Sequence, residues 1–173
     1  TGEEVEYPVS DDSPLAAFVF KTREDPYGKM SYLRVFGGVL ASDSRVYNAA
    51  LNEEVRVGGL QVMRGKDQLP VSKLHAGDIG AVVKLGETQT NHTLSTHEHR
   101  LQIAPIVQPE PIVSVAVHPV SQSDTAKLST ALHRLVGEDP TLRWRNEPAT
   151  REIILSGMGN AHLDIAVKKA RSK

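Results

Sequence analysis

The chain of 173 residues contains no cysteine, and its charge is nearly balanced. Without cysteine, neither a disulfide framework nor a thiolate zinc site can form. The 20 basic residues are matched by 21 acidic ones, which gives a formal net charge of −1. A free-standing nucleic-acid-binding protein usually carries a clear basic excess. Any contact with RNA is therefore expected to be local or shared with other parts of a larger protein, and we expect no DNA partner.

Long apolar segments are also missing. No apolar run approaches the roughly 20 residues that a membrane-spanning helix needs, so we expect no membrane partner. The stretch 1–6 is acidic and lacks an apolar centre, which excludes a secretory signal peptide. These absences predict a soluble, cytoplasmic protein. Because the sequence does not start with Met, we expect it to be a piece of a longer chain.

The first half of the sequence has the pattern of short β-strands. Inward and outward positions alternate over residues 32–39, as in a strand with one buried face. The glycine pair Gly37–Gly38 interrupts this alternation and predicts a bulge or a bend. The positions expected to face inward are Leu33, Val35 and Val39. Further strands are expected at 15–20, 45–48, 54–62 and 79–85, with a polar turn at 21–29. Short strands at this spacing predict a closed antiparallel barrel or a sandwich.

Three prolines within residues 105–111 mark the expected boundary between two domains. On this basis we expect an acidic leader or linker at 1–13, a β-barrel domain at 14–107 and a second domain at 108–173.

Past this boundary the pattern changes to alternating strands and helices. A strand is expected at 112–117, a hairpin from the stretches 142–145 and 151–155, and a last helix at 161–171. Between them, a helix is expected to start at Ser121, with Asp124 completing a short capping box, and to end at Gly137. The order β-α-β-β-α is one strand short of a ferredoxin-like fold. We therefore expect an α+β domain that lacks its last strand, with an unpaired sheet edge and an uncovered apolar stripe.

The segment 153–164 is expected to be a strand, a glycine turn and the start of a helix. Gly157 and Gly159 would allow backbone angles closed to other residues, and Asn160 is a good N-cap. His162 and Asp164 follow on the first turn of this helix. They are two positions apart, so their side chains should diverge, and no nucleophile lies beside them. We therefore expect no catalytic residue in this segment.

Residues 156–164 read Ser-Gly-Met-Gly-Asn-Ala-His-Leu-Asp, and residues 138–143 read Glu-Asp-Pro-Thr-Leu-Arg. Both stretches resemble motifs of the third domain of elongation factor G, the GTPase that drives ribosomal translocation. The stretch 109–117 is similar to the entry strand of the same domain. Other stretches resemble its second domain: 18–21, 25–29, 34–40 and 76–79. These stretches follow one another in the family's order and spacing. Together they span about residues 14–171.

The resemblance implies a fold and a set of contacts. The first domain would be the Greek-key barrel of translational GTPases, and the second would be ferredoxin-like. Thr141 and His162 would border a cleft against the GTPase domain, beside the turn Gly157–Met158–Gly159, at the place where fusidic acid binds. Lys29 and Arg34 would contact the phosphates of small-subunit ribosomal RNA. The partners implied are the ribosome, including one small-subunit ribosomal protein, and the GTPase and distal domains of the same protein.

The sequence also departs from the family pattern. Asn160–Ala161 replaces the usual Glu-Leu, Leu142 replaces an aromatic residue, and Phe36–Gly37 stands in place of Tyr-Ser. The first two differences put fusidic acid sensitivity in doubt. The Asn160–Ala161 departure and a reworked loop at 86–98 favour a divergent paralogue over the standard factor.

No nucleotide site is expected in this chain. The near match to a phosphate-binding loop, residues 28–31, has Met30 after its lysine and Arg23 where the first glycine should stand, and no Asn-Lys-x-Asp motif is present. GTP and Mg²⁺ would therefore belong to a GTPase domain outside the chain. Three histidines, His92, His97 and His99, are close in sequence, but their segment has the composition of a solvated loop, so we expect no metal site.

We therefore expect a fragment of an elongation factor G-like translocase that is not itself an enzyme. It would supply ribosome docking and an interdomain relay. A GTPase fragment of the ribosomal-protection type, and a free-standing module that binds RNA or protein, are the alternatives. No constellation supports a hydrolase or a metalloenzyme.

Overall fold

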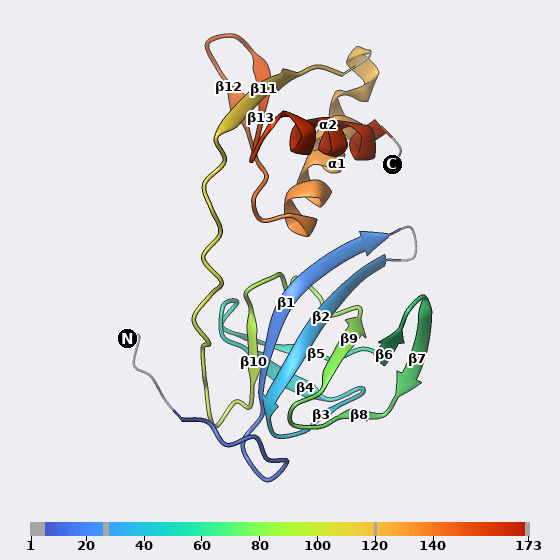
Figure 1. The fold of residues 1–173 in the computed structure, drawn as a ribbon, viewed down its shortest axis with the longest axis vertical. Coiled ribbons are helices and arrows are strands. Elements are labelled where there is room, and N and C mark those ends of the chain that lie inside the picture. The colour runs from blue at the N-terminus through green and yellow to red at the C-terminus, as the bar shows by residue number, and fades with distance from the viewer. Residues whose placement is uncertain (1–5, 26–27, 120, 172–173) are drawn as a thin grey trace. The chain divides into compact units, whose positions relative to one another are not determined.

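The computed structural model describes residues 6–25, 28–119 and 121–171. The chain divides into two compact units, Thr1–Ile106 and Val107–Lys173 (Figure 1). Each unit has its own apolar core, and each is described by itself.

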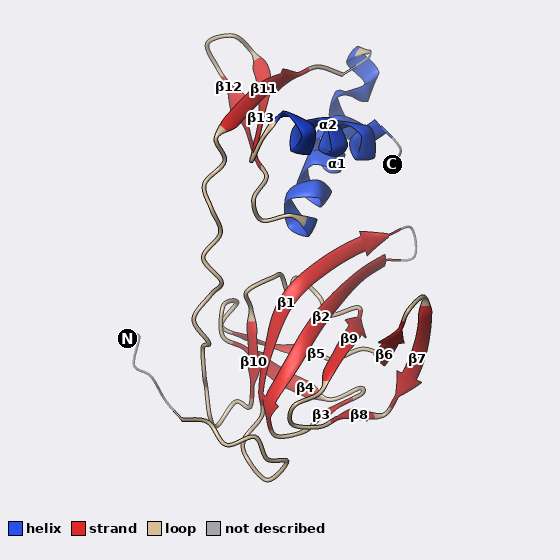
Figure 2. Ribbon diagram, viewed as in Figure 1, coloured by secondary structure: helices blue, strands red, loops and turns tan. Residues whose placement is uncertain are grey.

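Unit 1 is built from antiparallel strands (Figure 2). Eight strands form one sheet in the order β5-β4-β10-β1-β2-β9-β6-β7, and β3 pairs separately with β8. The strands are β1 (Ala16–Asp25), β2 (Gly28–Gly37), β3 (Leu40–Ala41), β4 (Arg45–Asn48), β5 (Glu53–Arg56), β6 (Leu60–Arg64), β7 (Asp67–Val71), β8 (Lys73–Leu74), β9 (Ile79–Val83) and β10 (Thr93–Ser95).

The predicted closure of these strands into a barrel is not found in the described residues. Among the residues that the structure describes, β5 pairs only with β4 and β7 pairs only with β6, so both are edge strands of the sheet. Strand β7 is largely exposed and contains Pro70, which has no N–H to donate to a further strand. The unit is therefore a β-rich domain whose hydrogen-bonded ladder stays open at these two edges.

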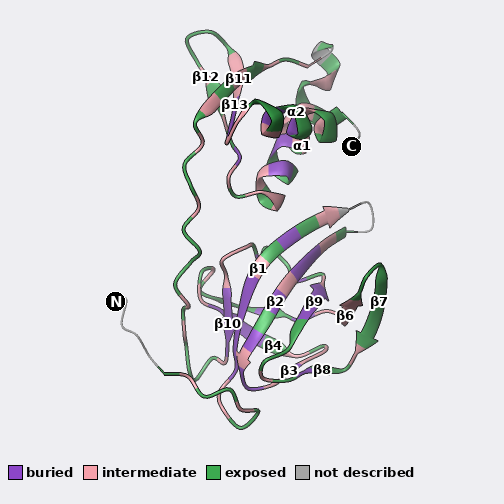
Figure 3. Cartoon of the chain, viewed as in Figure 1, coloured by how far each residue is buried: buried purple, intermediate pink, exposed green. Residues whose placement is uncertain are grey.

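The alternation predicted for β2 is confirmed for most of its length (Figure 3). Leu33 and Val35 are fully buried in the core, whereas Arg34 between them is exposed. The expected inward position of Val39 is wrong, because Val39 is only half-buried and Leu40 enters the core. Gly38 has a φ of +73°, and this left-handed residue changes the direction of the chain before Leu40.

The hairpin between β1 and β2 is longer than predicted. The segment 21–29 was expected to be a polar turn, but its residues continue both strands, with Lys21 opposite Tyr32 and Asp25 opposite Gly28. The polar side chains did not stop the strands because one face of this hairpin points to solvent, where polar residues are stable. The expected turn at residues 26–27 lies outside the described residues.

Unit 2 has the predicted order β-α-β-β-α and is an α+β domain. Its elements are β11 (Val113–Val117), the 3₁₀ turn η1 (Gln122–Asp124), α1 (Thr125–Glu138), β12 (Arg143–Glu147), β13 (Glu152–Gly157) and α2 (Asn160–Arg171). The sheet is antiparallel in the order β11-β13-β12. Leu132, Leu155 and Leu163 bring α1, β13 and α2 into one core. Within the described residues, β11 pairs on one side only.

The helix starts of unit 2 differ in part from the prediction. The 3₁₀ turn η1 follows Ser121 directly, as expected for a helical segment, but α1 itself starts at Thr125. The Ser121 hydroxyl donates to the Asp124 carboxylate at 2.7 Å, and Asp124 makes no side-chain cap bond to α1. The helix also continues past Gly137 to Glu138. At α2, Asn160 is the first helical residue, since the carbonyl of Gly159 already accepts the N–H of Leu163 at 3.0 Å. Neither helix of the described residues is long and apolar enough to cross a membrane.

Two adjacent glycines of unit 1 allow a direct test of packing. A Cβ added at Gly58 would lie 2.0 Å from the carbonyl oxygen of Val83, whereas a Cβ added at Gly59 would meet nothing within 4 Å. We expect Gly58→Ala to destabilise the chain by about 2–3 kcal/mol, because β9 must move away, and Gly59→Ala to change stability by less than about 1 kcal/mol. Thermal unfolding of both variants checks this. Equal melting temperatures would contradict the close approach.

Candidate functional site

The Asp139 carboxylate joins two loops of unit 2. Asp139 ends α1 and is followed by Pro140, which disfavours a helical conformation in the residue before it. Its φ of −129° and ψ of 99° are extended, and its N–H still bonds to the carbonyl of Leu135 at 2.9 Å. The carboxylate therefore points away from the end of α1, toward the glycine turn that follows β13.

One carboxylate oxygen fixes Thr141. Oδ1 of Asp139 accepts the backbone N–H of Thr141 at 2.9 Å and the Thr141 hydroxyl at 2.6 Å. This local arrangement is the turn that an aspartate makes with the residue two positions on. The Asp139 carbonyl also accepts the N–H of Leu142, whose side chain is buried in the core. The orientation of Thr141 is thus set by both the carboxylate and the buried neighbour.

The other carboxylate oxygen fixes His162. Oδ2 of Asp139 lies 2.9 Å from Nε2 of His162, although the two residues are 23 positions apart. On the other side of the ring, Nδ1 lies 3.2 Å from the backbone nitrogen of Met158 and accepts its N–H. Because Nδ1 accepts a hydrogen bond, the ring proton must be on Nε2, which donates to the carboxylate. A neutral imidazole satisfies both contacts.

The pKa of Asp139 is below its usual range. Burial is the largest influence and raises this pKa, but the hydrogen bonds from Thr141 and His162 together lower it by more. Asp139 is therefore an ionised acceptor at neutral pH. A charged acceptor makes stronger hydrogen bonds than a neutral one, which favours the joined arrangement of the two loops.

Gly157 has a steric role, which corrects the prediction for the glycine turn. Neither Gly157 nor Gly159 has a positive φ. A Cβ at Gly157 would lie 2.9 Å from Cδ2 of Leu163, 3.1 Å from Nδ1 of His162 and 3.2 Å from Cδ2 of Leu142. At Gly159 an added Cβ would meet nothing within 4 Å. Close packing, and not an unusual backbone angle, explains the glycine at 157.

The polar groups of this arrangement are already hydrogen-bonded to one another. Both ring nitrogens of His162 are engaged, so the ring is not placed as a general base. The hydroxyl of Ser156 shares a hydrogen bond with Ser114 at 2.8 Å, and Asp164 is exposed on α2. The site presents Thr141, Met158 and His162 at the junction of two loops that Asp139 holds together.

The sequence motifs indicated Thr141 and His162 but not Asp139. The Asp-Pro-Thr spacing is a local signal for its turn with Thr141. Its contact with His162 has no local signal, because it depends on how α1 and α2 pack.

The two predicted RNA-contact residues are not brought together on one face. Lys29 and Arg34 both lie on β2, but at positions of opposite parity, which point to opposite faces of a strand. The Arg34 guanidinium is exposed and lies 5.4 Å from the centre of the Phe36 ring. Lys29 is half-buried near His92, and burial together with this lysine lowers the pKa of His92.

The three loop histidines do not converge. Nδ1 of His92 lies 3.2 Å from the Asn48 amide and 3.3 Å from the backbone nitrogen of Gln89. Nε2 of His97 lies 2.8 Å from the Arg100 guanidinium, while His99 is exposed. In the described part of the chain, no three residues of the types His, Asp and Glu gather as metal ligands would.

Two family models match the chain. The model described as elongation factor G domain 2 matches residues 14–97, and the model described as elongation factor G, domain III matches residues 108–173. A crystal structure of a protein from Thermus thermophilus is 34% identical to the chain, with a TM-score of 0.79. This similarity covers 92% of the chain and 24% of the Thermus protein. The chain therefore spans about a quarter of that relative's length.

A double-mutant cycle measures the contact that holds the two loops together. For Asp139→Ala, His162→Ala and the double variant, we expect a favourable coupling free energy of about 1–2 kcal/mol in urea unfolding, which is low for a charge-assisted hydrogen bond because both side chains are partly exposed. The matched control repeats the cycle with Asp164→Ala in place of Asp139→Ala. Asp164 is exposed and two positions from His162, so its coupling should be close to zero. A coupling at Asp139 as small as that of the control would show that the contact contributes nothing to folding.

Proposed function

The chain belongs to the elongation factor G family, of which it carries domain 2 and domain III, and from that premise we propose that it is part of a translational GTPase that acts on the ribosome. The observation that carries this proposal is the junction of Thr141 and His162 through Asp139. Two of the sequence motifs that resemble the family meet there. The chain would work in the cytoplasm, within the larger protein.

GTP hydrolysis would belong to a part of the protein outside this chain. The two family models that match are those of domain 2 and domain III, and neither describes a GTPase domain. GTP and Mg²⁺ would bind in that other part. This chain would contribute docking surface and transmit the nucleotide state to distal domains.

Docking would involve the outer face of the β1–β2 hairpin. Arg34 is exposed there, and its guanidinium can bind phosphate oxygens of small-subunit ribosomal RNA. Lys29 would contribute from the other side of the strand. Phosphate contacts position a protein without reading sequence, which is consistent with a net charge close to zero and only local basic residues.

The relay would run through unit 2. The Asp139–His162 contact connects the end of α1 with the start of α2, so a force on Thr141 or His162 is transmitted to both helices. Rigid bodies joined in this way convert small local shifts into movements of whole elements. In the parent protein, Thr141 and His162 would face the GTPase domain, and a small-subunit ribosomal protein would be a further partner.

Unit 2 also has room for one more strand. Strand β11 pairs only with β13 in the described residues, and a groove of about 600 Å³ lies between β11, α1 and α2. The groove is mostly apolar, lined by residues such as Val117, Leu128 and Val167. A fourth strand beside β11 would complete the ferredoxin-like order β-α-β-β-α-β.

Within the family, a divergent paralogue fits better than the standard factor. Asn160 and Ala161, where the sequence departs from the family motif, are exposed on the first turn of α2. The departure therefore changes the surface beside His162 and leaves the contact with Asp139 in place. A ribosomal-protection GTPase is the alternative.

The coding DNA on both sides of this segment tests the proposal. We expect a Gly-x-x-x-x-Gly-Lys-Ser/Thr motif upstream, followed by Asn-Lys-x-Asp, and a short apolar strand after Lys173. A start codon directly before Thr1 together with a stop codon after Lys173 would contradict the proposal. The free-standing binding module would then be the better explanation.

The relay is tested by two glycine variants in the longer protein. We expect Gly157→Ala to lower ribosome-stimulated GTP turnover by about tenfold, since it displaces His162, and Gly159→Ala to leave it unchanged. Gly58→Ala controls for a general loss of stability, because it acts in the other unit. Unchanged turnover in Gly157→Ala, or an equal loss in Gly58→Ala, would overturn the relay.

A further inference from the structure

Residues 6–13, which precede β1, are fastened to the surface of unit 1, although the sequence predicts a leader or linker there. These residues are mostly exposed, and Val9 is 68% exposed, so little apolar surface is buried. What holds the segment is a set of specific contacts at two separate places. We call residues 6–13 the strap.

The first contact lies at the end of β2, where Tyr7 packs on Gly37. A Cβ added at Gly37 would lie 2.5 Å from Cε1 of Tyr7, so the ring rests where only glycine leaves space. The Tyr7 hydroxyl donates to the carbonyl of Pro14 at 2.7 Å. Beside the ring, the N–H of Gly38 donates to the carbonyl of Ser10 at 2.9 Å.

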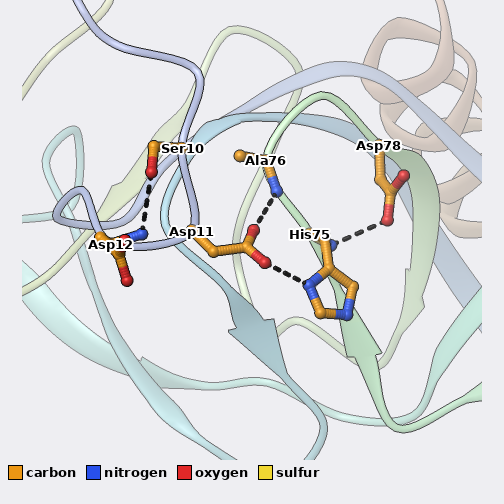
Figure 4. Close-up of polar contacts among 6 residues, drawn as sticks. All are labelled: Ser10, Asp11, Asp12, His75, Ala76 and Asp78. Carbon is orange, nitrogen blue, oxygen red and sulfur yellow. Dashed lines mark hydrogen bonds and ion pairs between the residues drawn. The ribbon is translucent and has the colours of Figure 1, made fainter.

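The second contact is the turn between β8 and β9 (Figure 4). The two oxygens of the Asp11 carboxylate are used separately. Oδ1 accepts the backbone N–H of Ala76 at 3.0 Å, and Oδ2 lies 2.7 Å from Nδ1 of His75. Asp11 therefore binds both a backbone N–H and a histidine side chain of this turn.

Each half of this contact is built by its own hydrogen bonds. In the turn, Asp78 accepts the N–H of His75 at 2.8 Å, and Gly77 donates its N–H to the carbonyl of Val35 at 2.8 Å. In the strap, the N–H of Ser10 bonds to the carbonyl of Pro8 at 3.0 Å. The strap and the turn between β8 and β9 each keep their shape through hydrogen bonds of their own. The strap can therefore separate from the turn without unfolding unit 1.

We propose that the strap is a latch that opens and closes as one unit, with Tyr7 on Gly37 and Asp11 on the His75–Ala76 turn as its two fasteners. A few polar contacts at the surface, with little apolar burial, give such a segment a low opening free energy. The two fasteners share one short stretch of chain. Releasing either one removes the constraint that holds the other in place.

The charges around Asp11 favour the closed latch. The hydrogen bond from Ala76 and then that from His75 lower the pKa of Asp11, and Lys73 adds to this effect from β8. The remaining carboxylate at the turn, Asp78, is occupied by the N–H of His75. Asp11 therefore stays ionised, and the latch stays fastened, above the usual pKa range of a carboxyl group.

The latch sets the length of the tether in front of unit 1. Opening it frees eight residues, and an extended chain of that length spans roughly 25 Å. In the proposed parent, where a GTPase domain precedes Thr1, a closed latch would keep that domain close and an open latch would let it move away. This consequence rests on the proposed function, whereas the latch itself does not.

Amide hydrogen exchange by NMR on the 173-residue chain tests the latch. One fastener is mutated, and amide exchange is measured at the other fastener. Gly37→Ala should increase exchange at the Ala76 amide at least about tenfold, and Asp11→Ala should do the same at the Gly38 amide. Tyr7→Ala opens the latch without a change in β2, and both amides should then exchange faster. Amides of the core strands should keep their protection in every variant.

Two matched controls accompany these variants. Asp12→Ala removes the carboxylate next to Asp11. Asp12 bonds to Ser10 through its backbone N–H, which the variant keeps, so exchange at Gly38 should stay within about twofold of the unaltered chain. Gly59→Ala adds a methyl group where nothing lies within 4 Å, so exchange at Ala76 should not change. If Asp11→Ala affected only Ala76, and Tyr7→Ala only Gly38, the two contacts would be independent and the latch would be refuted. Because these readouts lie in unit 1, their outcome is independent of whether the parent is a GTPase.

Discussion

The hydrogen bond between the Asp139 carboxylate and Nε2 of His162 is the constraint around which unit 2 is arranged. It requires α1 to end with an extended residue and α2 to begin close to that end. Core packing adds a steric condition at Gly157, where a Cβ would lie 2.9 Å from Cδ2 of Leu163 and 3.1 Å from Nδ1 of His162. The carboxylate orients Thr141 with its other oxygen. One ionised group therefore joins the end of α1 to the first turn of α2 and orients the two polar side chains at the site.

The sequence predicted the regular parts of the fold because burial there repeats with a fixed period. Leu33 and Val35 follow that period, and both are fully buried. The period fails after Gly38, where a left-handed residue redirects the chain and Leu40 replaces Val39 in the core. Barrel closure could not be judged from such local patterns, because it depends on whether the edge strands β5 and β7 find partners.

Local signals were least reliable where a side chain had two partners to choose from. Ser121 and Asp124 have the spacing of a capping box, but they bond to each other and α1 begins after them. The motif resemblance indicated Thr141 and His162, whereas Asp139 was overlooked because its contact with His162 spans 23 positions of sequence. The strap was predicted as a linker for a related reason. Its composition is polar, and only the fold of unit 1 brings Asp11 to its hydrogen-bond partners His75 and Ala76.

The tautomer of His162 is the most direct test of the junction between the two loops of unit 2. Two-dimensional NMR of the ¹⁵N-labelled imidazole distinguishes a protonated Nε2 from a protonated Nδ1. We predict that Nε2 carries the proton at neutral pH and that its signal shifts when Asp139 is replaced by Ala, since the carboxylate is then no longer its acceptor. A proton on Nδ1, or a His162 signal that is insensitive to Asp139, would contradict the joined arrangement of the two loops.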